Sequence, residues 1–157
     1  MDTAILAQID ALLQGSRCWG AELDLKYRVL AVTFEPDATR HPDGDIEDAR
    51  LQLVLHPVNA IQGRLVHDGT TLERFDVEQL PLVVDRLDGA RIDRPVVTSS
   101  TPKLLGELSF EGRADVPDGY RHIAALSLQG NDRLLSMRCT FDEAELRRPD
   151  GSALALS

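Results

Sequence analysis

Residues 122–141 read HIAALSLQGNDRLLSMRCTF, and this stretch decides the fold class. Apolar and polar positions alternate on both sides of Gly130-Asn131, a pair that suits a two-residue type II′ turn between antiparallel strands. The apolar face of the return strand consists of Leu135, Met137, Cys139 and Phe141. The stretch therefore predicts a β-hairpin with one buried and one solvated face.

The same two-residue rhythm extends over most of the chain. It recurs in 18–74 and again in 103–157, so we expect a β meander in each range. Within the first meander, Pro57-Val58-Asn59-Ala60 separates two alternating runs and is expected to be a hairpin turn. The segment 142–157 suits either a helix or a final hairpin around Pro149-Asp150-Gly151, and we favour the hairpin.

Two short helices interrupt the strands. Residues 1–15 and 76–88 each carry apolar side chains three and four positions apart, which predicts one buried stripe per helix. In the second helix, Asp76 can cap the first turn and Gln79 can reach back to it as a capping box. Because proline donates no backbone hydrogen bond, that helix alternatively begins one turn later, near Pro81.

These elements predict an α+β fold in a single domain over 1–157. A chain of 157 residues with 43% hydrophobic and 27% charged residues has the length and composition of one globular domain. We expect a mainly antiparallel sheet of about six to eight strands, with an N-terminal helix at 1–15 and a short central helix at 76–88. Trp19, at the start of the first strand, is expected to be a core anchor.

The charge balance excludes one class of partner and favours another. The chain has 26 acidic and 17 basic residues and a formal charge of −9, which opposes binding to nucleic-acid phosphates. The densest acidic cluster lacks the glycine and the closing glutamate of a calcium loop, since Asp48 and Val54 occupy those places. We interpret it as an acidic interaction loop that steers a basic protein partner. Its residues are Asp43, Asp45, Glu47 and Asp48.

The spacing of reactive side chains does not define a catalytic centre, a metal site or a cofactor site. The histidines lack metal-ligand or dyad spacing, and Ser99-Ser100-Thr101 lacks the turn that exposes a serine nucleophile. We therefore favour a non-catalytic protein-binding domain over an enzyme. The alternative is a small-molecule-binding protein or enzyme with a site in the curved sheet. That site would be lined by Trp19, Tyr27 and a histidine.

The N-terminus and the cysteines indicate a cellular compartment. The first residues lack the basic region of a secretion signal, and apolar runs are too short for a membrane span. Cys18 and Cys139 are far apart and are expected to be reduced, buried thiols. We expect a cytoplasmic protein without membrane contact. Homo-oligomers are a further expectation, through a sheet edge or the first helix.

Two stretches carry a resemblance to a known family. Residues 51–61 (LQLVLHPVNAI) and 135–141 (LSMRCTF) resemble the immunity protein 50-like group of small β-rich bacterial proteins, in strand order and in the late cysteine-containing strand. The resemblance covers about a third of the chain and carries over no functional residue. It implies an immunity-like inhibitor that protects bacteria from polymorphic toxins.

Overall fold

The computed structural model describes residues 3–44, 46–67, 70–87, 90–92, 97–98, 122–129 and 133–156. Two α-helices and one 3₁₀ turn occur in these ranges: α1 (Thr3–Leu13), η1 (Val77–Gln79) and α2 (Leu80–Arg86). The first five strands are β1 (Arg17–Asp24), β2 (Val29–Glu35), β3 (Leu51–His56), β4 (Asn59–His67) and β5 (Thr71–Glu73). The remaining five are β6 (Ala90–Ile92), β7 (Val97–Thr98), β8 (His122–Gln129), β9 (Arg133–Phe141) and β10 (Glu143–Arg147).

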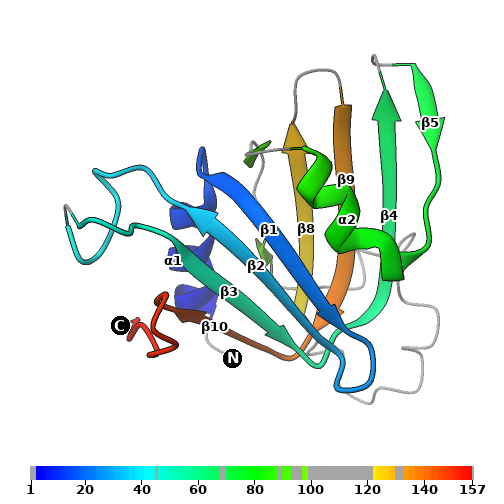
Figure 1. Cartoon of the computed structure of the whole chain (residues 1–157). Helices are drawn as coiled ribbons and strands as arrows, with labels where there is room; N and C mark the ends of the chain where they lie inside the picture. The colour runs from blue at the N-terminus through cyan, green and yellow to red at the C-terminus, as the bar shows by residue number, and fades with distance from the viewer. Residues whose placement is uncertain are drawn as a thin grey trace.

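The strands form one antiparallel sheet, which confirms the predicted α+β class. Its order is β10-β3-β2-β1-β6-β8-β9-β4-β5, and β7 pairs with β8 beside this path. Among the described residues there are ten strands rather than six to eight, because β6 and β7 are too short to show alternation in the sequence. Figure 1 shows two layers, one formed by β1, β2 and β3 and the other by β8, β9, β4 and β5.

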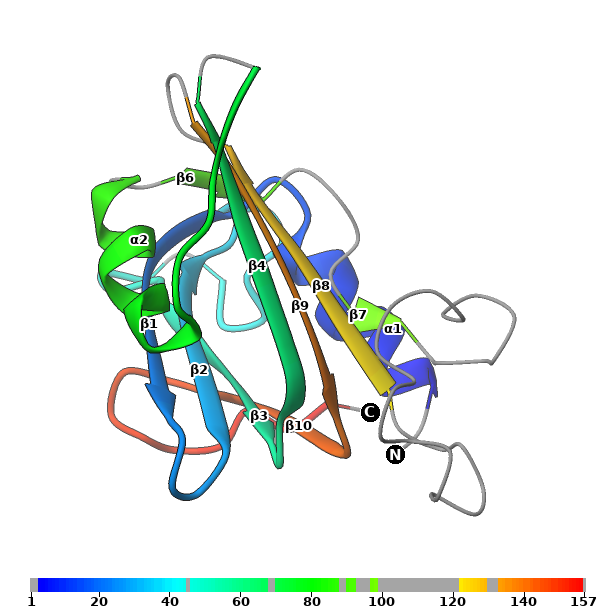
Figure 2. The ribbon, with the colours of Figure 1, turned by 90° about the vertical axis from the view of Figure 1, so that its right-hand side faces the viewer.

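Two corners connect the layers. Only Asp142 separates β9 from β10, and only residues 57–58 separate β3 from β4. The register pairs Asn59 with Thr140 on one side of the corner and His56 with Glu143 on the other. The β3–β4 segment and the β9–β10 segment therefore bend together, and their antiparallel ladder passes from one layer into the other (Figure 2).

The expected hairpin at residues 57–60 is wrong. β3 pairs with β2 and β10, whereas β4 pairs with β5 and β9, so the two strands that flank Pro57 do not pair with each other. Alternation specifies which face of a strand is buried, but it does not specify the neighbouring strand. The segment therefore turns a corner of the sheet where the sequence predicts a reversal.

The two helices contribute their apolar stripes to one continuous core. The buried helical side chains are Leu6, Ile9, Leu12 and Leu13 of α1, with Leu80, Val83, Val84 and Leu87 in and just after α2. The short central helix is confirmed with the later of its two expected starts, because α2 begins at Leu80, next to Pro81, and the capping box at Asp76 and Gln79 is wrong. Gln79 is itself the N-cap and its side chain makes no capping bond, because η1 occupies the preceding turn and Pro81 lies in the first turn of α2.

Two further expectations concern Trp19 and the segment 142–157. Trp19 is 40% exposed and is not a core anchor, because the register shift between Cys18 and Gly20 leaves Trp19 as the extra residue and turns it outward. At the other end, β10 is followed by a turn at Gly151 (φ +87°) and a bridge from Arg147 to Ala153, so the favoured hairpin is correct. The first part of the second expected meander, residues 103–121, and the Gly130-Asn131 turn lie outside the described residues.

Candidate functional site

The acidic loop is partly neutralised by the chain itself. The Arg148 guanidinium donates two hydrogen bonds to Asp43, at 2.9 and 3.1 Å, and Arg50 binds Asp48 in the same two-pronged way at 3.0 and 3.1 Å. These hydrogen bonds hold the pKa of both carboxyls below its usual range. Glu47 is exposed, and Asp45 lies outside the described residues. A role for this loop in binding a basic protein stays a prediction.

The histidines lie in different parts of the fold. His41 is buried and accepts a hydrogen bond from the Asp43 backbone N–H at 3.0 Å. His122 is buried with its ring 5.4 Å from that of Phe141, and His67 pairs with Glu73. In the described ranges there is no group of three or more histidine, cysteine or acidic side chains placed to hold a metal ion.

Both cysteines are free and buried, as expected. Burial raises the pKa of the Cys18 thiol to about 12, and burial likewise raises the pKa of Cys139 to about 12. A thiol with such a pKa stays protonated near neutral pH, and only the thiolate is a strong nucleophile. These two side chains therefore pack as small apolar groups in the core.

The site proposed for Trp19, Tyr27 and a histidine is not assembled in the described residues. Tyr27 is 67% exposed in the β1–β2 turn, and neither aromatic ring lines the groove at the sheet surface that is described next.

A different set of side chains comes together on the outward surface of β4, β5 and β9. The register places Gln62 opposite Arg138 and Arg64 opposite Ser136, and directly paired residues of antiparallel strands share one face. Leu65 lies opposite Glu73, so the next residue, Arg74, lies beside Arg64. We call this set the arginine face: Gln62, Arg64, Arg74, Ser136 and Arg138.

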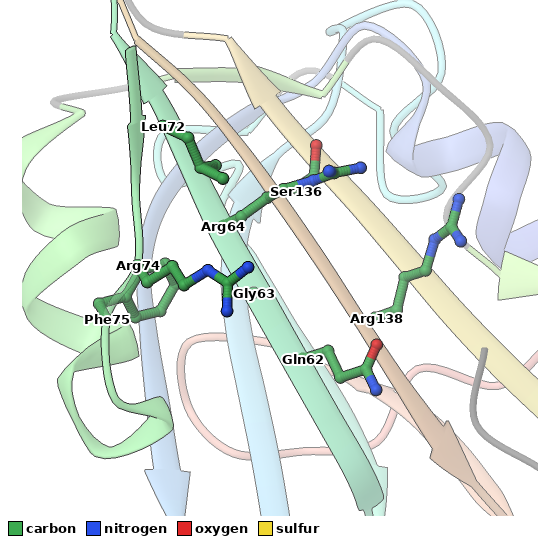
Figure 3. A pocket seen from close by; sticks show the side chains of 8 residues that line it. All are labelled: Gln62, Gly63, Arg64, Leu72, Arg74, Phe75, Ser136 and Arg138. Atoms are coloured by element: carbon green, nitrogen blue, oxygen red, sulfur yellow. The ribbon is translucent and has the colours of Figure 1, made fainter. Parts of the chain in front are cut away.

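The arginine face borders a groove of about 420 Å³ that is also lined by Gly63, Leu72 and Phe75. Figure 3 shows that Arg74 extends across β4, that the Arg64 guanidinium lies beside Ser136, and that Arg138 extends over the neighbouring strand. The inward side chains of the same strands, such as Leu65 and Leu135, belong to the core. The face is thus a fixed part of the sheet surface.

Gly63 and Phe75 set the shape of the groove. A Cβ atom on Gly63 would lie 2.6 Å from Cζ of Phe75, so only glycine allows the ring to pack here. Phe75 packs against the core. Because side chains alternate along an extended chain, anchoring Phe75 on the inner side directs the preceding Arg74 outward.

No carboxylate neutralises the arginine face within the described part of the chain. Arg64, Arg74 and Arg138 form neither an ion pair nor a hydrogen bond with any described residue. Glu73, the acidic residue next to Arg74, pairs with His67 instead. Three guanidinium groups therefore share one surface without a counter-charge from the described residues.

The sequence pattern does not single out these three arginines. Arg64 and Arg138 are 74 positions apart, and alternation places their strands in different expected meanders, 18–74 and 103–157. One signal was available: neither Arg64 nor Arg138 has an acidic residue two positions away, where a strand would place it on the same face.

Comparison of the chain with protein-family models, with curated proteins and with solved structures found no match. The resemblance to immunity protein 50-like proteins therefore stays a prediction. Within the part of the chain that the structure describes, none of the helices has the length and apolar character to cross a membrane.

Proposed function

We propose that this chain is a non-catalytic binding domain whose arginine face holds a small anionic ligand. The observation that carries this proposal is the placement of Arg64, Arg74 and Arg138 on one outward surface without a described carboxylate partner. Guanidinium groups form two parallel hydrogen bonds to carboxylate or phosphate oxygens, which makes them suited to such a ligand.

The energetics of the sheet support the same proposal. Like charges on opposite strand positions are destabilising. Arg64 and Arg74 are each adjacent in the chain to the paired residues Leu65 and Glu73, so continuing this ladder by one residue places the two arginines opposite each other. A bound anion would remove this repulsion and add charge-assisted hydrogen bonds. A neutral ligand would leave the repulsion in place.

Two features favour binding of a small ligand over catalysis or over a long polyanion. The groove is lined by arginine, glutamine, serine and apolar residues, and no histidine, cysteine or carboxylate from the described residues lines it to serve as a base or nucleophile. The net charge of −9 repels an extended polyanion, whose binding needs many phosphate contacts over a wide basic surface.

Titration calorimetry with inorganic pyrophosphate at low ionic strength tests the proposal. We expect binding to the unmodified chain and a loss of about tenfold or more in affinity for Arg64→Gln, because one charge-assisted hydrogen-bonded pair is removed. Arg147→Gln is the matched control, since Arg147 is also an exposed strand arginine but is paired with Glu145. We expect this control to retain affinity within about twofold.

Two results would contradict the proposal. One is the absence of heat of binding for the unmodified chain at millimolar pyrophosphate. The other is an equal loss of affinity in both variants, which would show that the anion responds to overall charge and not to this surface.

A further inference from the structure

The arginine face continues into an apolar row along the same three strands. The register places Val66 opposite Leu72 on one side and opposite Leu134 on the other. These three residues share the outward face with Arg64, two positions away along β4. Leu72 is 47% exposed, and Val66 and Leu134 are half-buried. A charged row and an apolar row therefore lie side by side.

The number of arginines indicates how much charge the ligand carries. One phosphate monoester carries about 1.5 to 2 negative charges at neutral pH, which leaves one of three guanidinium groups unmatched. The negative charge of two linked phosphoryl groups matches the charge of all three guanidinium groups. Neighbouring strands are about 4.8 Å apart, so guanidinium groups from two or three strands can each contact a different phosphoryl oxygen.

We infer that the ligand is an organic diphosphate with an aliphatic group. Its phosphoryl groups lie on Arg64, Arg74 and Arg138, and its aliphatic group lies on the apolar row of Val66, Leu72 and Leu134. This inference rests on the proposed function and adds the chemical class of the ligand.

The apolar row distinguishes an aliphatic diphosphate from a nucleoside diphosphate. Val66, Leu72 and Leu134 offer no side-chain donor or acceptor for the edge of a base. Phe75 is the one aromatic residue among the described residues that line the groove, and its ring packs over Gly63 and against the core. An aliphatic group gains from the contact simply by leaving water.

The experiment compares three probes by titration calorimetry: inorganic pyrophosphate, geranyl diphosphate at concentrations where it is monomeric, and uridine diphosphate. We expect geranyl diphosphate to bind about tenfold more tightly than pyrophosphate, because apolar surface of Leu72 is removed from water. Uridine diphosphate should bind no more tightly than pyrophosphate.

Substitution of the apolar row separates this inference from the proposed function. Leu72→Ser should abolish the preference for geranyl diphosphate, so that geranyl diphosphate and pyrophosphate bind this variant with about the same affinity. Leu82→Ser is the matched control, because Leu82 is 59% exposed on α2, away from the groove, and should leave both affinities unchanged. Equal binding of the two probes to the unmodified chain, or a preference that survives in Leu72→Ser, overturns the inference while pyrophosphate binding stands. Failure of all probes to bind overturns the proposed function as well.

Discussion

Two arginine clusters on this sheet are built alike and differ in their partners. One is the arginine face on β4, β5 and β9. The other is a groove of about 290 Å³ on β2, β3 and β10, to which three arginines contribute. These are Arg50, Arg147 and Arg148, and we call them the paired cluster. In both clusters, polar residues of three neighbouring strands form a row across the outward surface: in the second, Arg147 lies opposite Gln52, which lies opposite Thr33.

The difference lies in the carboxylates. Each arginine of the paired cluster has one acidic partner: Asp48 for Arg50, Glu145 for Arg147 and Asp43 for Arg148. Asp48 and Glu145 are each two residues away in sequence from the arginine they pair with, and Asp43 and Asp48 both belong to the acidic loop. The arginine face has no such partner among the described residues. Among the described residues, carboxylates thus neutralise the paired cluster and not the arginine face, which is the basis for proposing ligand binding at the arginine face.

The largest expected effect on stability comes from substituting Gly63, the glycine in the groove of the arginine face. Gly63→Ala places a Cβ atom against the Phe75 ring, so we expect the free energy of unfolding to fall by about 1–3 kcal/mol, as for other overpacked sites. Urea denaturation measures this fall in the free energy of unfolding. The double variant Gly63→Ala/Phe75→Leu should lose less free energy of unfolding than the sum of the losses in the two single variants.

Gly151, beside the paired cluster, is the control. It has open space around its Cα but a φ of +87°, so Gly151→Ala should cost about 1 kcal/mol through backbone strain alone. Phe75→Leu should not alter that cost. Additive losses for the Gly63 and Phe75 variants would refute the contact described here.

The second prediction is that substitutions in the two clusters change the free energy of unfolding in opposite directions. Without ligand, Arg64→Gln should raise the free energy of unfolding by about 0.2–1 kcal/mol, because repulsion from Arg74 is removed. Arg148→Gln should lower it, because Asp43 loses its partner. Thermal unfolding of both variants in one low-salt buffer checks this, and destabilisation of both would show that the arginine face is neutralised in the folded chain. High salt should shrink both effects.

The smallest effect is a pH dependence confined to the paired cluster. Hydrogen bonds from Arg148 and Arg50 lower the pKa of Asp43 and Asp48 below the ordinary value of 3.8. A lowered folded-state pKa stabilises the fold above the unfolded-state pKa, and this contribution is lost as the pH falls through the folded-state value. The gap in Tm between the unmodified chain and Asp43→Asn/Asp48→Asn should therefore close below about pH 3.8. The gap for Arg64→Gln should not close, and a pH-independent gap for the aspartate variant would contradict the assignment.

The same comparison shows what the sequence could and could not predict. Alternation at Leu135, Met137 and Cys139 correctly predicts a strand and its buried face, because a period of two residues is a local property. The hydrophobic stripes of the helices are local in the same way. Strand partners are not local, so the same alternation predicts a hairpin at Pro57 where the structure has a corner. The pattern also predicts a core position for Trp19, because a register shift leaves no mark in the pattern of hydrophobicity.

The candidate site was missed for the same reason. Arg64, Arg74 and Arg138 are unremarkable polar positions until the pairing of β4 with β5 and β9 places them side by side. The acidic loop was the opposite case: it is conspicuous in the sequence because its residues are contiguous. Its charge is reduced by Arg148, which lies about 100 positions away along the chain.

The shared corner at Asp142 also governs when the molecule can finish folding. β3 and β4 precede their common partner, the β9–β10 segment, and the paired residues are 66 to 95 positions apart. Pairs so distant in the chain carry a large loop-closure entropy, which slows folding. Both layers therefore wait for residues 133–147 to be made, and until then the strand edges of β3 and β4 that β9 and β10 later cover stay open to other chains.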